Sequence, residues 1–479
     1  MFTKAINGRG RYLFCEASNL ANLLELSQED LKRMLVRGNI TVSVVGLGWM
    51  GLPTACLLAD SGSKVIGVDI NPNVVQRLNE GNSHLDEPGL NNLVKKLMRT
   101  GKLKATTKIE EASSQSDVVI IVVPTLIDQS KKPDYSAIEN VCREISKGLR
   151  KGSLIIFTGT CGPGITERIT KSILEKHSGL KAGEDFGLGY SPLRAMGGRA
   201  LTDLQSYNRV VAGIDKKSLD ATCVVLSTVT KGELIRTRNI RTAEATKLFE
   251  TIYRDVNIGL ANEFAIFCER TGIDYMEAMV AANSQPYSHL LVPGVGVGGH
   301  CLPVYPYMLL DEARSHDVKL RIVKTSRSMN EDMPRHVVGL AADGLRSVGK
   351  SLRRVRVTVL GISYRPNVKE TRYSPSLELL SLLKRRGAWI TVYDPKFSCD
   401  EISKFGYRAE PTLRKAVEKA DCVIIAVAHD EFRRLDAREL TALMGRSPVI
   451  VDCAHLIDSV QAEKGRAIYR GVGQGLWSK

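Results

Sequence analysis

One order of elements occurs twice in this chain of 479 residues, once near each end. An apolar stretch, a glycine turn, a helical stretch, a second apolar stretch and an aspartate follow one another over residues 42–69, and again over residues 355–394. A further aspartate, Asp117 or Asp421, directly precedes the next apolar stretch of each copy. Short apolar strands alternating with amphipathic helices are typical of a parallel sheet covered on both faces. The sequence therefore predicts an α/β fold with two similar nucleotide-binding halves.

The region between the two copies is predicted to be helical. Residues 242–272 carry apolar side chains at helical spacing up to Gly272, which indicates one long helix that connects domains or forms a subunit interface. Near the N-terminus, Ser27 and Asp30 predict a short capped helix that ends at Gly38. We expect four parts: an N-terminal helical extension at 1–40, a nucleotide-binding Rossmann domain at 41–240, a central helical and dimerisation domain at 241–345, and a C-terminal Rossmann-like domain at 346–479.

Composition narrows the possible partners and the location. The net charge of +15 comes from lysines and arginines spread along the chain without a nucleic-acid-reading motif, so we expect small anionic substrates rather than nucleic acid. No apolar run approaches the roughly 20 residues that span a membrane, and no signal peptide is recognised, so we expect a cytoplasmic protein. The ten cysteines include no C-x-x-C pair and are expected to be buried apolar residues rather than disulfides or metal ligands, with Cys301 as the exception.

The first glycine turn has the spacing of a dinucleotide site. Gly46, Gly48 and Gly51 form G-x-G-x-x-G directly after an apolar strand and before a helical stretch. Asp69 ends the next strand, where a carboxylate accepts hydrogen bonds from the ribose hydroxyls of NAD and repels the extra phosphate of NADP. We therefore predict NAD, although Arg77 leaves NADP open and a turn that binds nothing is the alternative. The predicted contacts are Gly46, Gly48, Trp49, Met50, Gly51 and Asp69.

A second glycine-rich loop, residues 294–299, leads through His300 to Cys301. Glycines let the backbone lie close to a ligand and supply amide donors, and a thiol at such a place can attack a carbonyl carbon. A flexible turn next to a buried cysteine is the other interpretation, and the loop alone does not decide between them.

Several passages, in this order, resemble one family over some 400 residues. They are Val44 to Pro53, Val122-Val123-Pro124-Thr125, Arg254-Asp255-Val256-Asn257-Ile258, Ala261-Asn262-Glu263, Gly298-Gly299-His300-Cys301, and Arg365-Pro366-Asn367-Val368 with Arg372 and Ser374-Pro375. The chain resembles the nucleotide-sugar 6-dehydrogenases, especially the UDP-N-acetyl-D-mannosamine branch of the UDP-glucose dehydrogenase family. The resemblance implies NAD-dependent oxidation of the C6 hydroxyl of a UDP-sugar to a carboxylate, a C-terminal UDP-sugar-binding domain and a homodimer.

The resemblance also implies roles for particular residues. Cys301 would be the nucleophile that captures an aldehyde as a thiohemiacetal and then carries a thioester, and Lys247 would stabilise an oxyanion or move a proton. Cofactor contacts would come from Thr125, Thr160 and Arg372. Substrate contacts would come from Arg194, Arg254, Gly298 and Arg365.

The chain departs from the family pattern mainly at acidic and polar site residues. A glutamate is replaced by Leu193, the aspartate four residues after the nucleophile by Tyr305, and the asparagine four residues after the lysine by Thr251. Further departures are Thr158-Gly159, Gln285, Tyr287 and Arg365. Because leucine moves no proton, we expect slow thioester hydrolysis. A two-electron oxidoreductase that stops before the acid and a non-catalytic nucleotide-binding paralogue are the alternatives.

Overall fold

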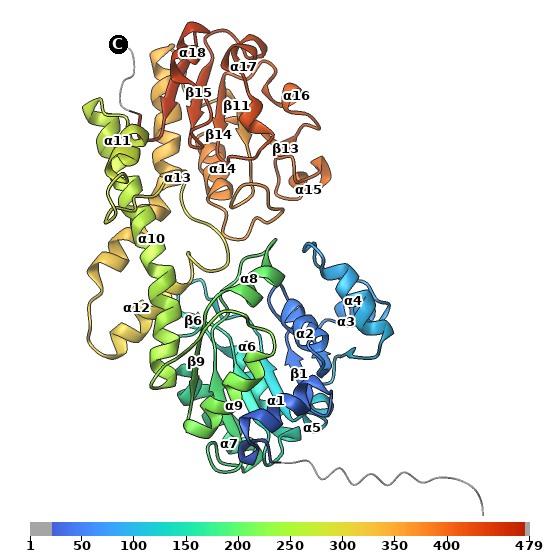
Figure 1. The fold of residues 1–479 in the computed structure, drawn as a ribbon. Coiled ribbons are helices and arrows are strands. Elements are labelled where there is room, and N and C mark those ends of the chain that lie inside the picture. The colour runs from blue at the N-terminus through green and yellow to red at the C-terminus, as the bar shows by residue number, and fades with distance from the viewer. Residues whose placement is uncertain (1–21, 475–479) are drawn as a thin grey trace, which may run out of the picture. The chain divides into compact units, whose positions relative to one another are not determined.

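A computed structural model describes residues 22–474 of the chain (Figure 1). The described residues form two compact units, which we call unit 1 and unit 2. Unit 1 comprises residues 22–124, 135–159 and 164–244, and unit 2 comprises residues 125–134, 160–163 and 245–474. Residues 1–21 of the predicted N-terminal extension lie outside the described part. The predicted domain boundaries stay predictions.

Unit 1 contains an eight-stranded sheet in the order β10-β9-β8-β7-β4-β1-β2-β3. All neighbours are parallel except β8 and β9. The strands are β1 (Thr41–Val45), β2 (Lys64–Val68), β3 (Leu103–Thr106), β4 (Val118–Ile121), β7 (Leu154–Phe157), β8 (Gly187–Tyr190), β9 (Arg209–Gly213) and β10 (Leu234–Arg236). The apolar run 118–123 continues two residues beyond the end of β4, because Pro124 cannot donate to a ladder and restricts the residue before it.

The helices of unit 1 cover a sheet whose central strands are buried. They are α1 (Gln28–Val36), α2 (Gly51–Asp60), α3 (Pro72–Asn79), α4 (Leu90–Arg99), α5 (Ile109–Ser114), α6 (Ser136–Gly148), α7 (Ser172–Ser178), α8 (Ala200–Ser206) and α9 (Lys216–Ser227), with a π-helical turn at Thr166–Lys171 and a 3-10 turn at Leu23–Glu25. The predicted capped helix is confirmed as α1: the Ser27 side chain accepts from the Asp30 N–H, and Gly38 follows the helix with φ of 73°.

Unit 2 contains three long helices and a shorter one, and the first of them, α10 (Ile240–Thr271), enters it at Ala245. α10 confirms the predicted long helix, and Gly272 with φ of 77° ends it. α11 (Tyr275–Ala282), α12 (Tyr305–Ser315) and α13 (Arg321–Ser347) follow, and a short hairpin of β5 (Leu126–Ile127) and β6 (Pro133–Asp134) belongs to the same unit. None of the helices within residues 22–474 is long and apolar enough to cross a membrane.

A second, all-parallel sheet completes unit 2, in the order β13-β12-β11-β14-β15-β16. Its strands are β11 (Arg356–Leu360), β12 (Trp389–Tyr393), β13 (Arg408–Ala409), β14 (Cys422–Ile425), β15 (Val449–Asp452) and β16 (Ile468–Gly471). The accompanying helices are α14 (Pro375–Arg385), α15 (Cys399–Ser403), α16 (Leu413–Val417), α17 (Ala437–Leu443) and α18 (Ser459–Lys464), with a 3-10 turn at Phe432–Arg434.

The predicted repeat is confirmed down to individual hydrogen bonds. In unit 1 the Asp69 carboxylate accepts from the N–H of Leu47, directly after the glycine of the turn, at 2.9 Å. In unit 2 the Asp394 carboxylate accepts from the N–H of Ile362 at the same point, at 2.8 Å. The second aspartates also match, since Asp117 accepts from Thr41 N–H at 2.9 Å and Asp421 from Arg356 N–H at 3.0 Å.

Candidate active site

The glycine turn between β1 and α2 is packed at two glycines and open at the third. A Cβ on Gly46, whose φ is +96°, would lie 2.3 Å from the Val122 carbonyl oxygen, and one on Gly51 would lie 1.7 Å from the Gly46 oxygen. A Cβ on Gly48 would meet no atom within 4 Å. α2 begins here without a side-chain cap, so the positive end of the helix is at the turn, although the Leu52 N–H donates to the Gly48 carbonyl at 3.1 Å and Pro53 has no N–H. The turn therefore fits the pyrophosphate of a dinucleotide.

Asp69 is half-buried at the end of β2, beside this turn. Its two oxygens accept from the N–H groups of Leu47 and Asn71, each at 2.9 Å, and a carboxylate has further lone pairs for ribose hydroxyls. The sequence interpretation missed His84, which interacts electrostatically with Asp69 and Arg77 and hydrogen-bonds the Leu47 backbone. Burial lowers the pKa of His84. His84 and Arg77 line an open depression of about 530 Å³ in this part of unit 1.

Substitutions at two of these glycines separate cofactor binding from folding. We expect Gly48→Ala to fold like the natural protein but to bind NAD about tenfold more weakly, because the methyl group fills the space at the turn. Gly51→Ala should lower the thermal unfolding midpoint, since its Cβ collides with backbone. Calorimetric titration with NAD and thermal unfolding measure the two effects. Unchanged NAD affinity in Gly48→Ala would contradict the assignment.

The loop that carries Cys301 is held against a segment following β11. A Cβ on Gly298 would lie 2.8 Å from Cβ of Tyr364, and one on Gly299, whose φ is +95°, would lie 2.7 Å from the Tyr364 ring. The Gly299 N–H donates to the Arg372 carbonyl at 2.9 Å. Gly298 and Gly299 are thus required for close packing. Cys301 is partly exposed, as is Cys399, whereas the other described cysteines are buried.

Polar contacts also hold the Cys301 loop against the segment that follows β11. Three predicted site residues come together here: Gly298, Arg365 and Arg372. The Glu370 carboxylate accepts from the Arg372 N–H at 2.9 Å and lies 3.2 Å from Nε2 of His300. The Arg365 guanidinium lies 5.8 Å from the centre of the Tyr364 ring. The sequence interpretation did not single out Tyr364 or Glu370, because only the fold brings them beside Cys301.

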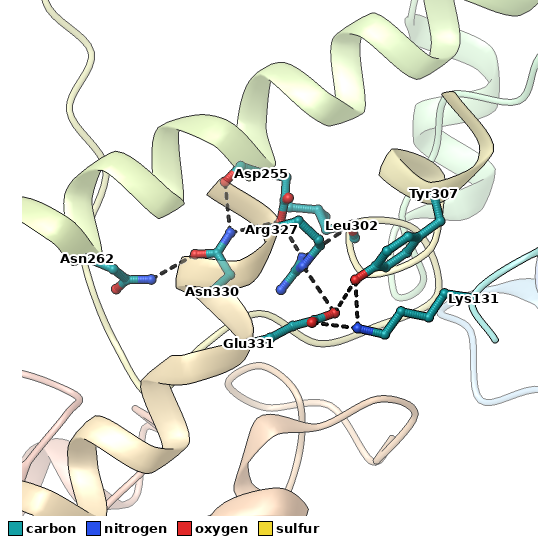
Figure 2. A network of polar contacts seen from close by, with 8 residues as sticks. All are labelled: Lys131, Asp255, Asn262, Leu302, Tyr307, Arg327, Asn330 and Glu331. Carbon is teal, nitrogen blue, oxygen red and sulfur yellow. Dashed lines mark hydrogen bonds and ion pairs between the residues drawn. The ribbon is translucent and has the colours of Figure 1, made fainter. Parts of the chain in front are cut away.

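A chain of side-chain amides fixes the start of the glycine loop (Figure 2). Oδ1 of Asn262, on α10, accepts from the Gly294 N–H at 3.0 Å. Its Nδ2 donates to Oδ1 of Asn330, on α13, at 2.8 Å. Nδ2 of Asn330 donates in turn to the Asp255 side chain at 3.0 Å and to the Asp255 carbonyl at 2.9 Å. The motif residues Asp255 and Asn262 therefore place the loop from within the helical core.

Asp255 also forms a buried ion pair with Arg327, and both side chains are almost fully buried. The Arg327 guanidinium donates further to the carbonyl of Leu302, the residue after Cys301, at 3.4 Å. Burial raises the pKa of Asp255 to about 6, although the charge of Arg327 acts in the opposite direction. Figure 2 shows the outer end of this network, where the Lys131 ammonium donates to Tyr307 at 2.8 Å and to Glu331 at 2.6 Å.

Cys301 lies next to two hydroxyl groups. The Tyr305 side chain interacts electrostatically with Cys301, and the Thr160 hydroxyl is also near it. The Tyr305 N–H donates to the Cys301 carbonyl at 2.9 Å, which closes one turn at the start of α12. Unit 2 therefore contains both Cys301 and Thr160, and Tyr305 is near each of them.

Lys247 lies on α10 and is half-buried. Thr251, at the position of the missing asparagine, donates its hydroxyl back to the Lys247 carbonyl at 3.0 Å. Thr125, also in unit 2, is buried, and its hydroxyl lacks a hydrogen-bond partner among the described residues. An unsatisfied buried hydroxyl fits a residue that contacts a bound group.

The remaining residues singled out by the sequence have different surroundings; they are Arg194, Arg254, Leu193 and Tyr287. Arg194 belongs to unit 1 and donates to the Asn208 carbonyl at 3.1 Å. Arg254 is exposed on α10. Leu193 packs against the apolar core of unit 1, and Tyr287 is 91% exposed. The substrate contacts predicted for Arg194 and Arg254 stay predictions, and so do the effects of the departures at Leu193 and Tyr287.

Comparison with known families matches three successive parts of the chain. The UDP-glucose/GDP-mannose dehydrogenase NAD binding domain matches residues 40–230, the central domain of that family matches residues 241–332, and its UDP binding domain matches residues 358–459. The chain belongs to the UDP-glucose/GDP-mannose dehydrogenase family. The predicted resemblance, the α/β fold and NAD as the cofactor are thereby confirmed.

Relatives of this dehydrogenase share most of its length. UDP-N-acetyl-D-mannosamine dehydrogenase of Pyrococcus horikoshii is 34% identical, covering 91% of this chain and 99% of the relative. NDP-N-acetyl-D-galactosaminuronic acid dehydrogenase of Ralstonia nicotianae is 33% identical, covering 86% and 95%. The solved structure of UDP-D-ManNAc dehydrogenase from Pyrococcus horikoshii matches with a TM-score of 0.84 at 33% identity, covering 91% of this chain and 100% of that one.

Proposed function

We propose that this family member oxidises the C6 hydroxyl of a UDP-N-acetylhexosamine, such as UDP-N-acetylmannosamine, to the carboxylate, with Cys301 as the nucleophile. The observation that carries the proposal is the partly exposed Cys301 thiol, on a glycine loop packed closely against Tyr364 and bonded to the Arg372 carbonyl. The names of the relatives support an N-acetylhexosamine as the sugar.

The glycine turn and Asp69 of unit 1 would hold NAD, which when bound would supply the hydride acceptor for each of the two oxidations at C6. After the first, the Cys301 sulfur forms a bond to the aldehyde carbon, the thiol loses its proton, and the aldehyde oxygen gains one. Lys247 would supply that proton or stabilise the oxygen as it becomes negative. After the second, water attacks the thioester carbon, the carbon–sulfur bond breaks with its electron pair on sulfur, and the acid leaves.

The experiment that tests this proposal follows NADH at 340 nm with purified protein, NAD and a panel of UDP-hexoses and UDP-N-acetylhexosamines. We expect two NADH for each molecule of a UDP-N-acetylhexosamine. One NADH for each sugar would instead support a two-electron oxidoreductase. Retained NAD binding without turnover of any sugar would support a non-catalytic nucleotide-binding protein.

We expect the thioester on Cys301 to accumulate during turnover. Leu193 packs in an apolar core, Thr251 is hydrogen-bonded within α10, and Tyr305 is protonated, so none of these three can remove a proton from water. Loss of a general base commonly slows such a step by about two to four orders of magnitude. Acid quenching and mass analysis of the Cys301 peptide measure the adduct. A free thiol together with fast acid production would refute this expectation.

The proposal extends to a cytoplasmic homodimer that assembles through α10. Large apolar side chains are exposed along this helix, which fits a stripe that one subunit alone does not cover. They are Phe249, Tyr253, Phe264 and Phe267. The molar mass in solution, measured by light scattering, tests the dimer.

A further inference from the structure

The second nucleotide-binding half contains a fully buried histidine, His429, beside the aspartate that follows β12. Its Nε2 lies 3.2 Å from a carboxylate oxygen of Asp394, and neither side chain is exposed to solvent. Its other ring nitrogen, Nδ1, accepts a hydrogen bond from the Asn367 N–H at 3.0 Å. A nitrogen that accepts from an amide carries no proton, so the ring proton is on Nε2 and is donated to Asp394. The His429 ring is therefore neutral and bonded at both nitrogens.

Asn367 forms a second bond to the same loop. Its side-chain oxygen accepts at 3.1 Å from the N–H of Asp430, the residue after His429. The φ of Asn367 is 61°, in the left-handed region that asparagine adopts more readily than most residues. The backbone and the side chain of Asn367 thus both bond to residues 429–430. Two bonds of this kind fix the orientation of the turn as well as its position.

The His429 ring is also held by an aromatic neighbour. The rings of His429 and Phe432 meet edge to face, with their centres 5.5 Å apart and their planes at 86°. Phe432 belongs to an apolar cluster that includes Leu360 of β11 and Ile425 of β14. Because such a core is densely packed and both ring nitrogens are bonded, the imidazole has one orientation.

The Asp394 carboxylate holds two points of the segment that links β11 to α14. At the start of the segment, one carboxylate oxygen accepts from the N–H of Ile362 at 2.8 Å and from the N–H and hydroxyl of Ser363, each at 3.1 Å. Farther along, the same oxygen holds the turn at Asn367 through the imidazole. Residues 364–366 lie between these two points, so their backbone is fixed at both ends.

The residues held in this way include a predicted substrate contact and a support of the glycine loop. Arg365 is the predicted contact, and a guanidinium offers the planar set of donors that suits the phosphates of a UDP-sugar. The Tyr364 ring supports the loop, since a Cβ on Gly299 would lie 2.7 Å from it. The UDP binding domain of the family matches residues 358–459, which include both the segment and the histidine.

We propose that His429 is a positioning residue whose neutral ring fixes the turn 364–367 for binding of the UDP part of the substrate. That this UDP carries a sugar to be oxidised rests on the proposed function. His429 is fully buried, so it acts through the turn and not on the ligand. Without the Nδ1 acceptor the Asn367 N–H is released, and only the fraction of molecules with the turn in place binds UDP.

The two copies of the repeat use the same aspartate differently under this proposal. Asp69 in unit 1 bonds to two backbone N–H groups and keeps lone pairs for a ligand. Asp394 in unit 2 gives the matching acceptor capacity to Ser363 and His429. The carboxylate that contacts a ligand in one half therefore positions a ligand-binding turn in the other.

Two substitutions separate the roles of the two ring nitrogens. In His429→Asn the amide oxygen takes the place of Nδ1 and accepts from the Asn367 N–H, but no donor reaches Asp394. In His429→Gln the amide nitrogen takes the place of Nε2 and donates to Asp394, but no acceptor meets the Asn367 N–H. The proposal therefore requires His429→Gln to be the more harmful change for UDP binding.

Calorimetric titration with UDP measures the effect on binding. We expect the Kd for UDP to rise about tenfold in His429→Gln, because one hydrogen bond is worth about tenfold in an equilibrium constant. In His429→Asn the Kd should rise by less than about threefold. Hydrogen exchange followed by mass spectrometry should show faster exchange of residues 364–370 in His429→Gln and near-natural exchange in His429→Asn.

Asn367→Gly tests the same contact from the surface, where the side chain is exposed and folding is not at risk. Glycine keeps the left-handed conformation without strain but removes the acceptor for the Asp430 N–H. We expect the Kd for UDP to rise about three- to tenfold. Unchanged UDP affinity in Asn367→Gly would overturn the proposal even if the His429 variants did not fold.

His336→Asn is the matched control, because it disrupts another histidine–carboxylate pair of unit 2. Nε2 of His336, on α13, lies 2.8 Å from the buried carboxylate of Glu269. This variant should lower the thermal unfolding midpoint and leave UDP affinity unchanged. If His429 served stability alone, its variants would behave in the same way. Unchanged UDP affinity in folded His429→Gln, or an equal loss in His429→Asn, would overturn the proposal.

Failure of this inference and failure of the proposed function give different results. UDP binding and hydrogen exchange are measured without NAD and without a sugar, so they do not depend on oxidation. Weaker UDP binding in His429→Gln, without turnover of any UDP-sugar by the natural protein, would leave the positioning role standing and refute the function. Two NADH for each sugar, with equal UDP affinity in the natural protein and in His429→Gln, would do the reverse.

Discussion

Cys301→Ala is expected to abolish formation of the acid, with a loss on the order of 10³-fold or more, as is usual when a catalytic nucleophile is removed. Without the thiol, the aldehyde has no group to capture it as the species from which the second hydride leaves. At most one NADH should form for each sugar. NADH yield and mass analysis of the sugar product measure the effect, and NAD affinity should not change.

Cys399→Ala is the control, because Cys399 is the other partly exposed cysteine in the described part of the chain and belongs to α15, outside the candidate site. It should keep two NADH for each sugar. If Cys301→Ala produced acid at the rate of the natural protein, Cys301 would have a structural role and would not be the nucleophile.

Arg327→Met is expected to lower the free energy of unfolding by about 3–5 kcal/mol, because it leaves the buried Asp255 carboxylate without its partner. The Cys301 loop should also lose order, since Arg327 holds the Leu302 carbonyl. Urea unfolding followed by circular dichroism measures the stability, and the alkylation rate of Cys301 reports on the loop.

The effect of Arg327→Met should depend on pH in a known direction. Because the pKa of Asp255 is about 6 in the folded protein and 3.8 ordinarily, the folded state binds a proton more readily than the unfolded state. The contribution of Asp255 to the free energy of unfolding therefore increases as the pH falls through about 6. Without Arg327, protonation of Asp255 removes the unpaired charge, so the loss at about pH 5 should be smaller than at about pH 8.

Two further variants decide whether the buried charge is the cause. Arg335→Met removes an arginine from the same helix, but its side chain is 69% exposed and pairs with exposed Asp332. It should change stability by less than about 1 kcal/mol. Asp255→Asn should recover part of the stability when combined with Arg327→Met. An equal loss in Arg335→Met would contradict the role given to burial.

Local order was predictable from the sequence where it depends on short-range chemistry. Apolar strands, glycine turns and terminal aspartates predicted both sheets, because each of these features acts over a few residues. The hydrogen bonds of Asp69 and Asp394 repeat as expected. The exact strand ends were less predictable: the apolar run 118–123 continues two residues beyond β4, which ends before Pro124.

The aspartates of the two copies nevertheless differ in burial and in bonding partners, and the sequence could not show this difference. Asp69 is half-buried and keeps acceptor capacity for a ribose. Asp394 is fully buried, and its carboxylate is also bonded to Ser363 at 3.1 Å and to His429 at 3.2 Å. His429 lies 35 residues away in sequence, so only packing shows that this aspartate is used internally.

By itself, the sequence determined the two nucleotide-binding halves, the long central helix, the family and the identity of Cys301 as the one cysteine with a chemical context. These follow from periodicity and from motifs in which neighbouring residues act together. Only the tertiary structure decided that Asp255 and Asn262 position the glycine loop and that Tyr364 and Glu370 clamp it. Those contacts join residues that are distant in the chain or depend on which side of a turn is buried, and burial is a property of the whole fold.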